Sequence, residues 1–449
     1  MKRLNYLNAL LLIHTLTLLT ILLLGAFTAL PASATEKTAD EAGLSGFRHL
    51  VQSATPLPET TPWDLETLSK PPVFEWSEGT QIRSLYYNSE PYKGKATRVF
   101  AYYATPGTIS GDPASDKDLP AIVLVHGGGG TAFSKWVKLW ASRGYAAIAM
   151  DLSGRGPNKK RLTDGAPDQS HDLKFGAIDQ PITEQWTYHA VANVIRAHSL
   201  IRSFPETDAE RTAITGISWG GYLTCIVAGV DGRFKAAVPV YGCGFLHENS
   251  VWLDQFAKMS DVNREKWVQL WDPSQYVPSA TMPMLFVNGG KDFAYPPDSH
   301  AKTYGLVQAH KNLHFVPDLR HGHIFHSPKA IEVFIQHHIE GKPALAKISS
   351  VKSDGDQVVA IFRANTKQVE AQLHYTVDKL PGTPKTRKWS SQTATISNNR
   401  ITADLPPANA TIWFLTLKDE RSTMISSELV FPREHKHIKE LKATDQSAP

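Results

Sequence analysis

Hydrophobic residues in the middle of the chain alternate between short continuous runs and the spacing of an amphipathic helix. Residues 121–125 are all apolar, as a strand covered on both faces of a sheet requires. Between residues 133 and 140, large apolar side chains recur at i, i+3, i+4 and i+7. A second apolar run follows at 146–150. This order predicts a strand, a helix and a second strand parallel to the first.

The same alternation repeats as far as about residue 340 and predicts the fold class. A polar loop over 152–181 and an irregular insert ending near residue 277 interrupt it. Repeated strand–helix units joined by right-handed crossovers build a mostly parallel sheet with helices on both faces, which is an α/β fold. Further strands are predicted at 212–217, 236–241, 283–287 and 313–317, and helices at 184–202, 220–230, 297–308 and 329–339.

Antiparallel strands are predicted on both sides of this region. Short runs of aromatic and β-branched residues precede it at 73–76, 82–87 and 97–103, and alternating strands follow it at 358–362, 370–377, 393–396 and 412–417. We therefore expect four parts after residue 34: an N-terminal extension with leading strands (35–115), an α/β core (116–343), a C-terminal β-sandwich-like domain (344–436) and a polar tail (437–449).

The first 34 residues have the pattern of an export signal. Lys2 and Arg3 precede a long apolar stretch, and the small residues Ala32-Ser33-Ala34 come before a polar segment, as at a signal-peptidase site. The apolar stretch approaches the roughly 20 residues that span a bilayer, so an uncleaved membrane anchor is the alternative. Cleavage is favoured, which predicts a periplasmic or secreted protein without a membrane contact once residues 1–34 are removed.

Composition and charge exclude several classes of protein. Of the 449 residues, 42% are hydrophobic and 20% charged, which is ordinary for a globular protein. The formal charge of +4 falls to about +2 without Lys2 and Arg3, so nothing points to nucleic acid. Cys225 and Cys243 lack metal-site spacing, and we predict neither a metal nor a cofactor. The two cysteines could form one disulfide or stay two buried thiols.

A serine lies in a G-x-S-x-G motif, Gly216-Ile-Ser218-Trp-Gly220, between a predicted buried strand and a predicted helix. There the chain turns so tightly that the serine takes strained backbone angles, and glycines on both sides avoid clashes with neighbouring backbone. The helix that begins at Ser218 would direct free amides and its positive end toward an oxyanion. Because the motif also occurs by chance in glycine-rich turns, the strand–turn–helix setting is the argument for a nucleophile.

A serine nucleophile needs a base and an orienting carboxylate, and later loops offer both. Asp292 follows the predicted strand that ends at Val287, where a loop would hold it over the sheet; an ordinary turn aspartate is the alternative. His321 follows the next predicted strand and is the preferred base, with His323 as the alternative. The chain order Ser, Asp, His is typical of the α/β-hydrolase fold.

A glycine-rich loop, His126-Gly-Gly-Gly-Gly130, directly follows the apolar run at 121–125. Backbone without Cβ atoms can approach a reacting carbonyl closely. A flexible turn is the alternative, but four glycines carry an entropic cost that a plain turn does not need. We predict an oxyanion hole made by the backbone amides of Trp219 and Gly128.

Together these motifs resemble the acetylxylan esterase-like, dienelactone-hydrolase-related branch of the α/β-hydrolase superfamily, over roughly residue 71 to the end. The segments that carry the resemblance are Val125-His-Gly-Gly-Gly-Gly130, Met150-Asp-Leu152, Gly216-Ile-Ser-Trp-Gly-Gly221, Trp271-Asp-Pro273, Met284-Leu-Phe-Val-Asn-Gly289 and Arg320-His-Gly-His323. The resemblance implies hydrolysis of acyl esters, often acetyl esters on polysaccharides, without a cofactor. The expected partner is a small-molecule or carbohydrate ester.

Two other functions compete with this expectation. Dienelactone hydrolases carry a cysteine nucleophile, so Ser218 argues against that chemistry. The prolyl oligopeptidase family has a similar catalytic core, which makes a serine peptidase the runner-up, but the about 85 residues between Thr35 and the first core strand are too few for its propeller. A carbohydrate-binding or catalytically inactive protein is the third possibility, against which the complete set of triad residues argues.

Overall fold

The computed structural model describes residues 55–323, 325, 328–379 and 384–432. The predicted signal peptide at 1–34 and the polar tail at 437–449 lie outside these residues. None of the described helices has both the length and the apolar character that crossing a bilayer requires.

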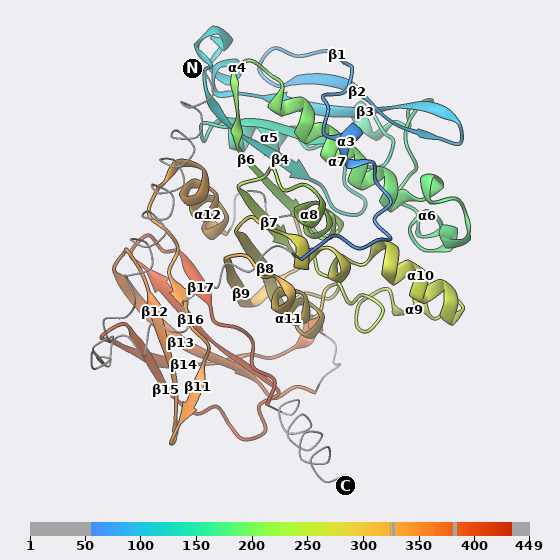
Figure 1. Ribbon diagram of the computed structural model, residues 1–449. Helices are drawn as coiled ribbons and strands as arrows, with labels where there is room; N and C mark the ends of the chain where they lie inside the picture. Colours follow the sequence, from blue (N-terminus) through green and yellow to red (C-terminus); the bar gives the residue numbers. More distant parts are fainter. Residues whose placement is uncertain (1–54, 324, 326–327, 380–383, 433–449) are drawn as a thin grey trace, which may run out of the picture. The chain divides into compact units, whose positions relative to one another are not determined.

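A twisted central sheet organises the core (Figure 1). Its strands lie in the order β1, β2, β3, β5, β4, β6, β7, β8, β9; the six from β5 to β9 are parallel, and β1 to β3 are antiparallel at one edge. The parallel strands are buried on both faces, as their continuous apolar sequences predicted. The strands are β1 (Phe74–Trp76), β2 (Arg83–Tyr92), β3 (Lys95–Ala104), β4 (Leu119–Val125), β5 (Ala146–Met150), β6 (Thr207–Ile217), β7 (Ala236–Val240), β8 (Met284–Lys291) and β9 (Lys311–Arg320).

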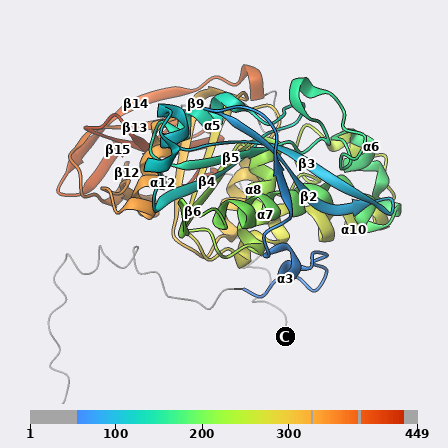
Figure 2. The same ribbon diagram turned by 90° about the horizontal axis from the view of Figure 1, so that it is seen from above.

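Helices cover both faces of this sheet. Figure 2 shows the sheet from above, with α5 and α7 on opposite sides of it. Helix α8 is apolar around its whole circumference because all of its residues are buried between the sheet and its neighbours. These features confirm the predicted α/β class. The main helices are α5 (Ser134–Ala141), α7 (Trp186–Arg202), α8 (Trp219–Val230), α11 (Pro297–Leu306) and α12 (Lys329–Glu340).

The two segments that interrupted the predicted alternation contain short helices. The polar loop over 152–181 holds α6 (His171–Lys174), and the insert before β8 holds α9 (Leu253–Phe256) and α10 (Asp261–Trp271). Trp267 and Trp271 of α10 are fully buried, so they belong to the core. Cys225 and Cys243 are buried free thiols, which decides against the disulfide.

The C-terminal region is rich in strands, as predicted. Strand β12 pairs with β11 and β15, β13 pairs with β16, and β14 pairs with both β13 and β15. Its division from the core as a separate domain stays a prediction. The strands are β10 (Lys347–Ile348), β11 (Lys352–Asp354), β12 (Gln357–Arg363), β13 (Gln368–Thr376), β14 (Ser390–Ser397), β15 (Arg400–Asp404), β16 (Ile412–Asp419) and β17 (Met424–Ser426).

This region is joined to the core through strand pairing and aromatic packing. Strand β17 pairs antiparallel with β9, with Ser426 opposite Leu313. The rings of Phe315 on β9 and Phe414 on β16 have centroids 5.1 Å apart. Trp389 packs on Gly290 so closely that a Cβ there would lie 2.3 Å from the indole nitrogen. The C-terminal region therefore supports the end of β8.

We predict that Trp389→Ala lowers the free energy of unfolding by about 2–3 kcal/mol, because removing a partly buried indole leaves a cavity against Gly290 and Phe315. Denaturant titration of the purified protein measures the change. Val369→Ala, at a valine that is 51% exposed in the same region, serves as the control and should change stability by less than about 0.5 kcal/mol. Equal effects of the two substitutions would contradict the packing argument.

Candidate active site

Ser218 occupies the sharp turn between β6 and α8. Its backbone angles are φ 61° and ψ −122°, outside the regions that non-glycine residues normally adopt. A Cβ at Gly216 would lie 2.2 Å from the carbonyl oxygen of Gly220, and one at Gly220 would lie 2.0 Å from that of Val125. Both flanking positions therefore exclude any side chain, as the motif predicted.

His321 joins Ser218 to Asp292. The Ser218 Oγ lies 2.8 Å from His321 Nε2, and His321 Nδ1 lies 2.8 Å from Asp292 Oδ2. Because Nδ1 donates to the carboxylate, Nε2 is the nitrogen free to accept the serine proton. Asp292 follows β8 directly and His321 follows β9 directly. The structure thus brings together the three residues that were predicted from the sequence as a catalytic triad and that lie on separate loops.

Asp292 is held rigidly at the end of β8. Its side chain is fully buried, and its second oxygen, Oδ1, accepts hydrogen bonds from the backbone amides of Ala294 at 2.7 Å and Tyr295 at 2.9 Å. Each carboxylate oxygen therefore has a partner. Oδ2 is left to orient His321, which is the geometry a triad acid needs.

His323, the alternative base, lies elsewhere. Its ring packs on Phe133 and Phe325, with centroid separations of 5.3 Å and 5.9 Å. Burial, followed by the nearby His126, His321 and Lys159, lowers its pKa. In the part of the chain that the structure describes, no group of three His, Cys, Asp or Glu side chains could hold a metal ion. The geometry therefore gives the position between serine and aspartate to His321.

Aromatic rings that the sequence did not nominate surround His321. Tyr241, Phe293 and Tyr295 lie with their centroids 4.8 Å, 5.2 Å and 6.0 Å from the imidazole. Tyr241 also donates a 3.0 Å hydrogen bond to the carbonyl of Arg320, which anchors the histidine loop. Their position in the sequence could have identified them. Each comes within a few residues of the end of a parallel strand, where side chains meet at the sheet edge.

The glycine-rich loop lies directly against the serine turn. A Cβ at Gly127 would be 2.8 Å from the Cβ of Ser218, and one at Gly128 would be 2.8 Å from Cδ1 of the Trp219 ring. The Gly129 amide donates to Oε1 of Gln169 at 3.1 Å, and the Gly130 amide donates to the Gly127 carbonyl at 3.1 Å. The amide of Gly128 stays a candidate oxyanion donor, as does that of Trp219 in the first turn of α8, where amides lack partners within the helix.

His126 holds this loop in place. Its Nδ1 donates to the Gly127 carbonyl at 2.8 Å, and its Nε2 accepts from the Leu152 amide at 2.8 Å. This pair of bonds requires the neutral imidazole, in agreement with the burial that lowers its pKa. His126 therefore positions the glycines and has no free nitrogen for proton transfer.

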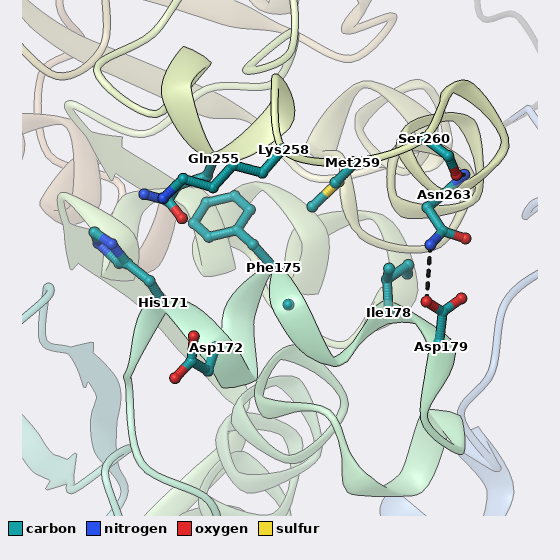
Figure 3. Close-up of a pocket in the computed structure, with 11 residues that line it drawn as sticks. His171, Asp172, Phe175, Ile178, Asp179, Gln255, Lys258, Met259, Ser260 and Asn263 are labelled. Atoms are coloured by element: carbon teal, nitrogen blue, oxygen red, sulfur yellow. Dashed lines mark hydrogen bonds between the residues drawn. The ribbon is translucent and has the colours of Figure 1, made fainter.

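A cleft of about 280 Å³ opens beside this region, between α6 and the α9–α10 pair (Figure 3). Phe175, Ile178 and Met259 form its apolar part, and Asn263 donates a 2.9 Å hydrogen bond to Asp179 at one end. The Phe175 ring also packs against Trp219, with centroids 5.9 Å apart. One aromatic side chain thus separates the cleft from the residue next to Ser218.

This chain resembles known proteins mainly over its core. A model of the acetyl xylan esterase (AXE1) family matches residues 77–326. Acetyl esterase Axe7A of Xylanibacter ruminicola is 21% identical over 193 residues, which cover 40% of this chain and 44% of that protein. The uncharacterized peptidase YuxL of Bacillus subtilis is 25% identical over 196 residues, which cover 39% of this chain and 26% of that protein. The chain thus spans less than half of either relative.

Among solved structures, the acetyl xylan esterase from Paenibacillus sp. R4 matches with a TM-score of 0.51 and 22% identity, covering 61% of this chain and 92% of that one. At this identity the match shows the α/β-hydrolase fold. Together with the family model, it confirms the resemblance that the sequence motifs indicated.

We predict that His321→Ala lowers kcat/KM for an activated ester by about a thousandfold or more, because Ser218 loses its base. His323→Ala is the matched control two residues away and should change kcat/KM by less than about tenfold. Steady-state kinetics of both variants, with thermal melting to check folding, makes the comparison. If His323→Ala lowers kcat/KM more than His321→Ala does, His323 is the base and the assignment of His321 is wrong.

Proposed function

The chain belongs to the acetyl xylan esterase (AXE1) family, and we propose that this serine hydrolase cleaves acyl esters through Ser218, His321 and Asp292 by way of an acyl-enzyme. The observation that carries the proposal is the continuous hydrogen-bonded path from the strained Ser218 through His321 to Asp292, with 2.8 Å at each step. The family match spans all three residues.

Acylation begins with transfer of the Ser218 hydroxyl proton to His321 Nε2. The serine oxygen attacks the ester carbonyl carbon, and the negative charge that develops on the carbonyl oxygen is held by the amides of Trp219 and Gly128. When the tetrahedral intermediate collapses, the imidazolium gives its proton to the departing alcohol. Asp292 stays ionised and stabilises the imidazolium.

Deacylation repeats these steps with water as the nucleophile. His321 takes a proton from the water, hydroxide adds to the acyl carbonyl, and the proton passes to Ser218 as the acid leaves. The glycine-rich loop keeps the oxyanion donors in place through both halves of the reaction, because its other amides are already bonded to Gln169 and Gly127.

For the substrate, we propose an acetyl or related ester on a carbohydrate. The family assignment supports the ester, and the name of the Axe7A relative supports the acetyl group. We also propose export to the periplasm or the medium, which the basic, apolar and small-residue pattern of residues 1–34 supports.

A serine peptidase is the second candidate, favoured by the similarity to YuxL. The fold before the core counts against this candidate. Residues 74–104 form the strands β1 to β3, which extend the central sheet and are not part of a propeller. Comparison of acetyl esters with Xaa-Pro amides distinguishes the two functions. Amide turnover faster than ester turnover by several decades would favour the peptidase.

We predict that a fluorophosphonate probe labels folded protein at Ser218, because the probe phosphonylates a serine, with loss of fluoride, only when a base activates it. Ser218→Ala should abolish labelling and lower ester hydrolysis by at least about ten-thousandfold. Ser142→Ala, at an exposed serine on the far end of α5, is the control and should retain both. Peptide mass spectrometry locates the adduct, and folded protein without an adduct on Ser218 would end the serine hydrolase proposal.

A further inference from the structure

Lys174 is a buried cation that forms no ion pair with any of the described residues. Its side chain lies at the end of α6 and is only 6% exposed. Its Nζ lies 4.4 Å from the centroid of the Trp219 ring and 5.6 Å from that of Trp186. Within the part of the chain that the structure describes, no hydrogen bond or ion pair reaches this nitrogen. The amine is also not among the fully enclosed polar atoms, so it keeps some contact with solvent.

The position of Lys174 connects it to the reacting serine. Trp219 follows Ser218 in the chain, and its ring edge lies against Gly128 of the glycine-rich loop. His171, Asp172 and Phe175 of the same segment line the outer cleft, where Lys174 takes no part (Figure 3). The lysine thus points inward from α6, toward the tryptophan that borders the proposed oxyanion hole.

Gln169 has a second unused donor, at the glycine-rich loop beside Gly128 and Gly129. Its Oε1 accepts the hydrogen bond from the Gly129 amide, which fixes the orientation of the side-chain amide. Its Nε2 is buried and has no hydrogen-bond partner. Such a group is costly to bury unless an acceptor reaches it in some state of the protein. Gln169 Nε2 and Lys174 Nζ are therefore two donors that lack an acceptor among the described residues, one at the glycine-rich loop and one at the Trp219 ring.

The charge on Lys174 is costly in the free protein. Burial lowers the pKa of Lys174 to about 8, and the field of Asp168 opposes this only in part. Cation–π contact with the faces of two tryptophans offsets part of the free energy that the ammonium loses with its hydration. An anion beside the ammonium would offset more of this free energy, because opposite charges attract strongly where water is scarce.

We propose that Lys174 and Gln169 form a subsite for a carboxylate carried by the ester substrate, next to Trp219 and the glycine-rich loop that border Ser218. This inference rests on the proposed esterase function and specifies its substrate class as esters with an acidic group on the acyl or the alcohol side. The competing role for Lys174 is a structural brace that holds the Trp219 ring by cation–π contact. A brace would support all substrates equally, whereas a subsite supports only the acidic ones.

The test compares matched esters that differ by one negative charge. An aryl hemisuccinate against the aryl butyrate probes the acyl side, and 4-carboxyphenyl acetate against 4-methylphenyl acetate probes the alcohol side. For at least one pair, Lys174→Met should lower the ratio of kcat/KM for the acidic ester to that for the neutral ester by about tenfold or more. Lys174→Arg should keep most of the ratio, because the guanidinium retains the charge.

Lys258→Met is the matched control, since Lys258 is exposed and lines the outer cleft beyond Phe175. It should leave both ratios within about twofold. If Lys174→Met lowers acidic and neutral esters in parallel, or changes neither, the subsite is wrong and the brace is favoured. If wild-type protein cleaves no ester of either pair, the proposed function itself fails.

The pH dependence of the wild-type protein gives a test that needs no folded variant. Because the lysine loses its charge as pH rises through about 8, the acidic-to-neutral ratio should be constant below that pH and fall above it. The neutral ester corrects for titration of the triad. The other groups that face the amine are Asp168 and His171 from its own segment and the uncharged tryptophans Trp186 on α7 and Trp219 on α8. A ratio that stays constant up to pH 10 would overturn the subsite.

Discussion

The crowding of backbone around Ser218 is the constraint on which the rest of the site depends. The turn brings the carbonyls of Gly220 and Val125 so close to the flanking glycines that neither could carry a Cβ. That closeness places Ser218 at the sheet edge, next to the first turn of α8 and to the glycine-rich loop. The strained angles at Ser218 persist because the buried β6 and α8 hold both ends of the turn.

The remaining groups of the site come from neighbouring parallel strands. Strands β8 and β9 pair in parallel, so their carboxyl ends deliver Asp292 and His321 to the same edge of the sheet. The Asp292 carboxylate is then fixed by two amides of its own loop, and the imidazole by three aromatic rings. Acid and base thus have little freedom to move, which reduces the reorganisation needed when charge develops.

Features that depend on local spacing could be predicted from the sequence. The apolar runs and helical periodicity identify the parallel strands, and a motif residue directly after such a run must lie at the carboxyl edge. The choice between His321 and His323 could not be made in the same way, because β9 continues to Arg320, beyond the residue 317 where its apolar run ends. The short α6 escaped detection because four residues show no period, and with it the environment of Lys174.

Contacts between distant segments produce no periodic pattern in the sequence, so they could not be predicted from it. The pairing of β9 with β17 is one of these contacts. Without β17, the amides and carbonyls of β9 around Leu313 and Phe315 would lie at an open sheet edge. In the structure, the Ser426 hydroxyl accepts a 2.9 Å hydrogen bond from the Phe315 amide and donates a 3.0 Å hydrogen bond to the Phe315 carbonyl. A hydrolase core trimmed after α12 would expose that edge, next to the apolar Leu313 and Phe315, to strand addition by other molecules. The C-terminal strands thus cover part of an edge of the catalytic sheet, which makes them a poor place to shorten the protein for expression or fusion.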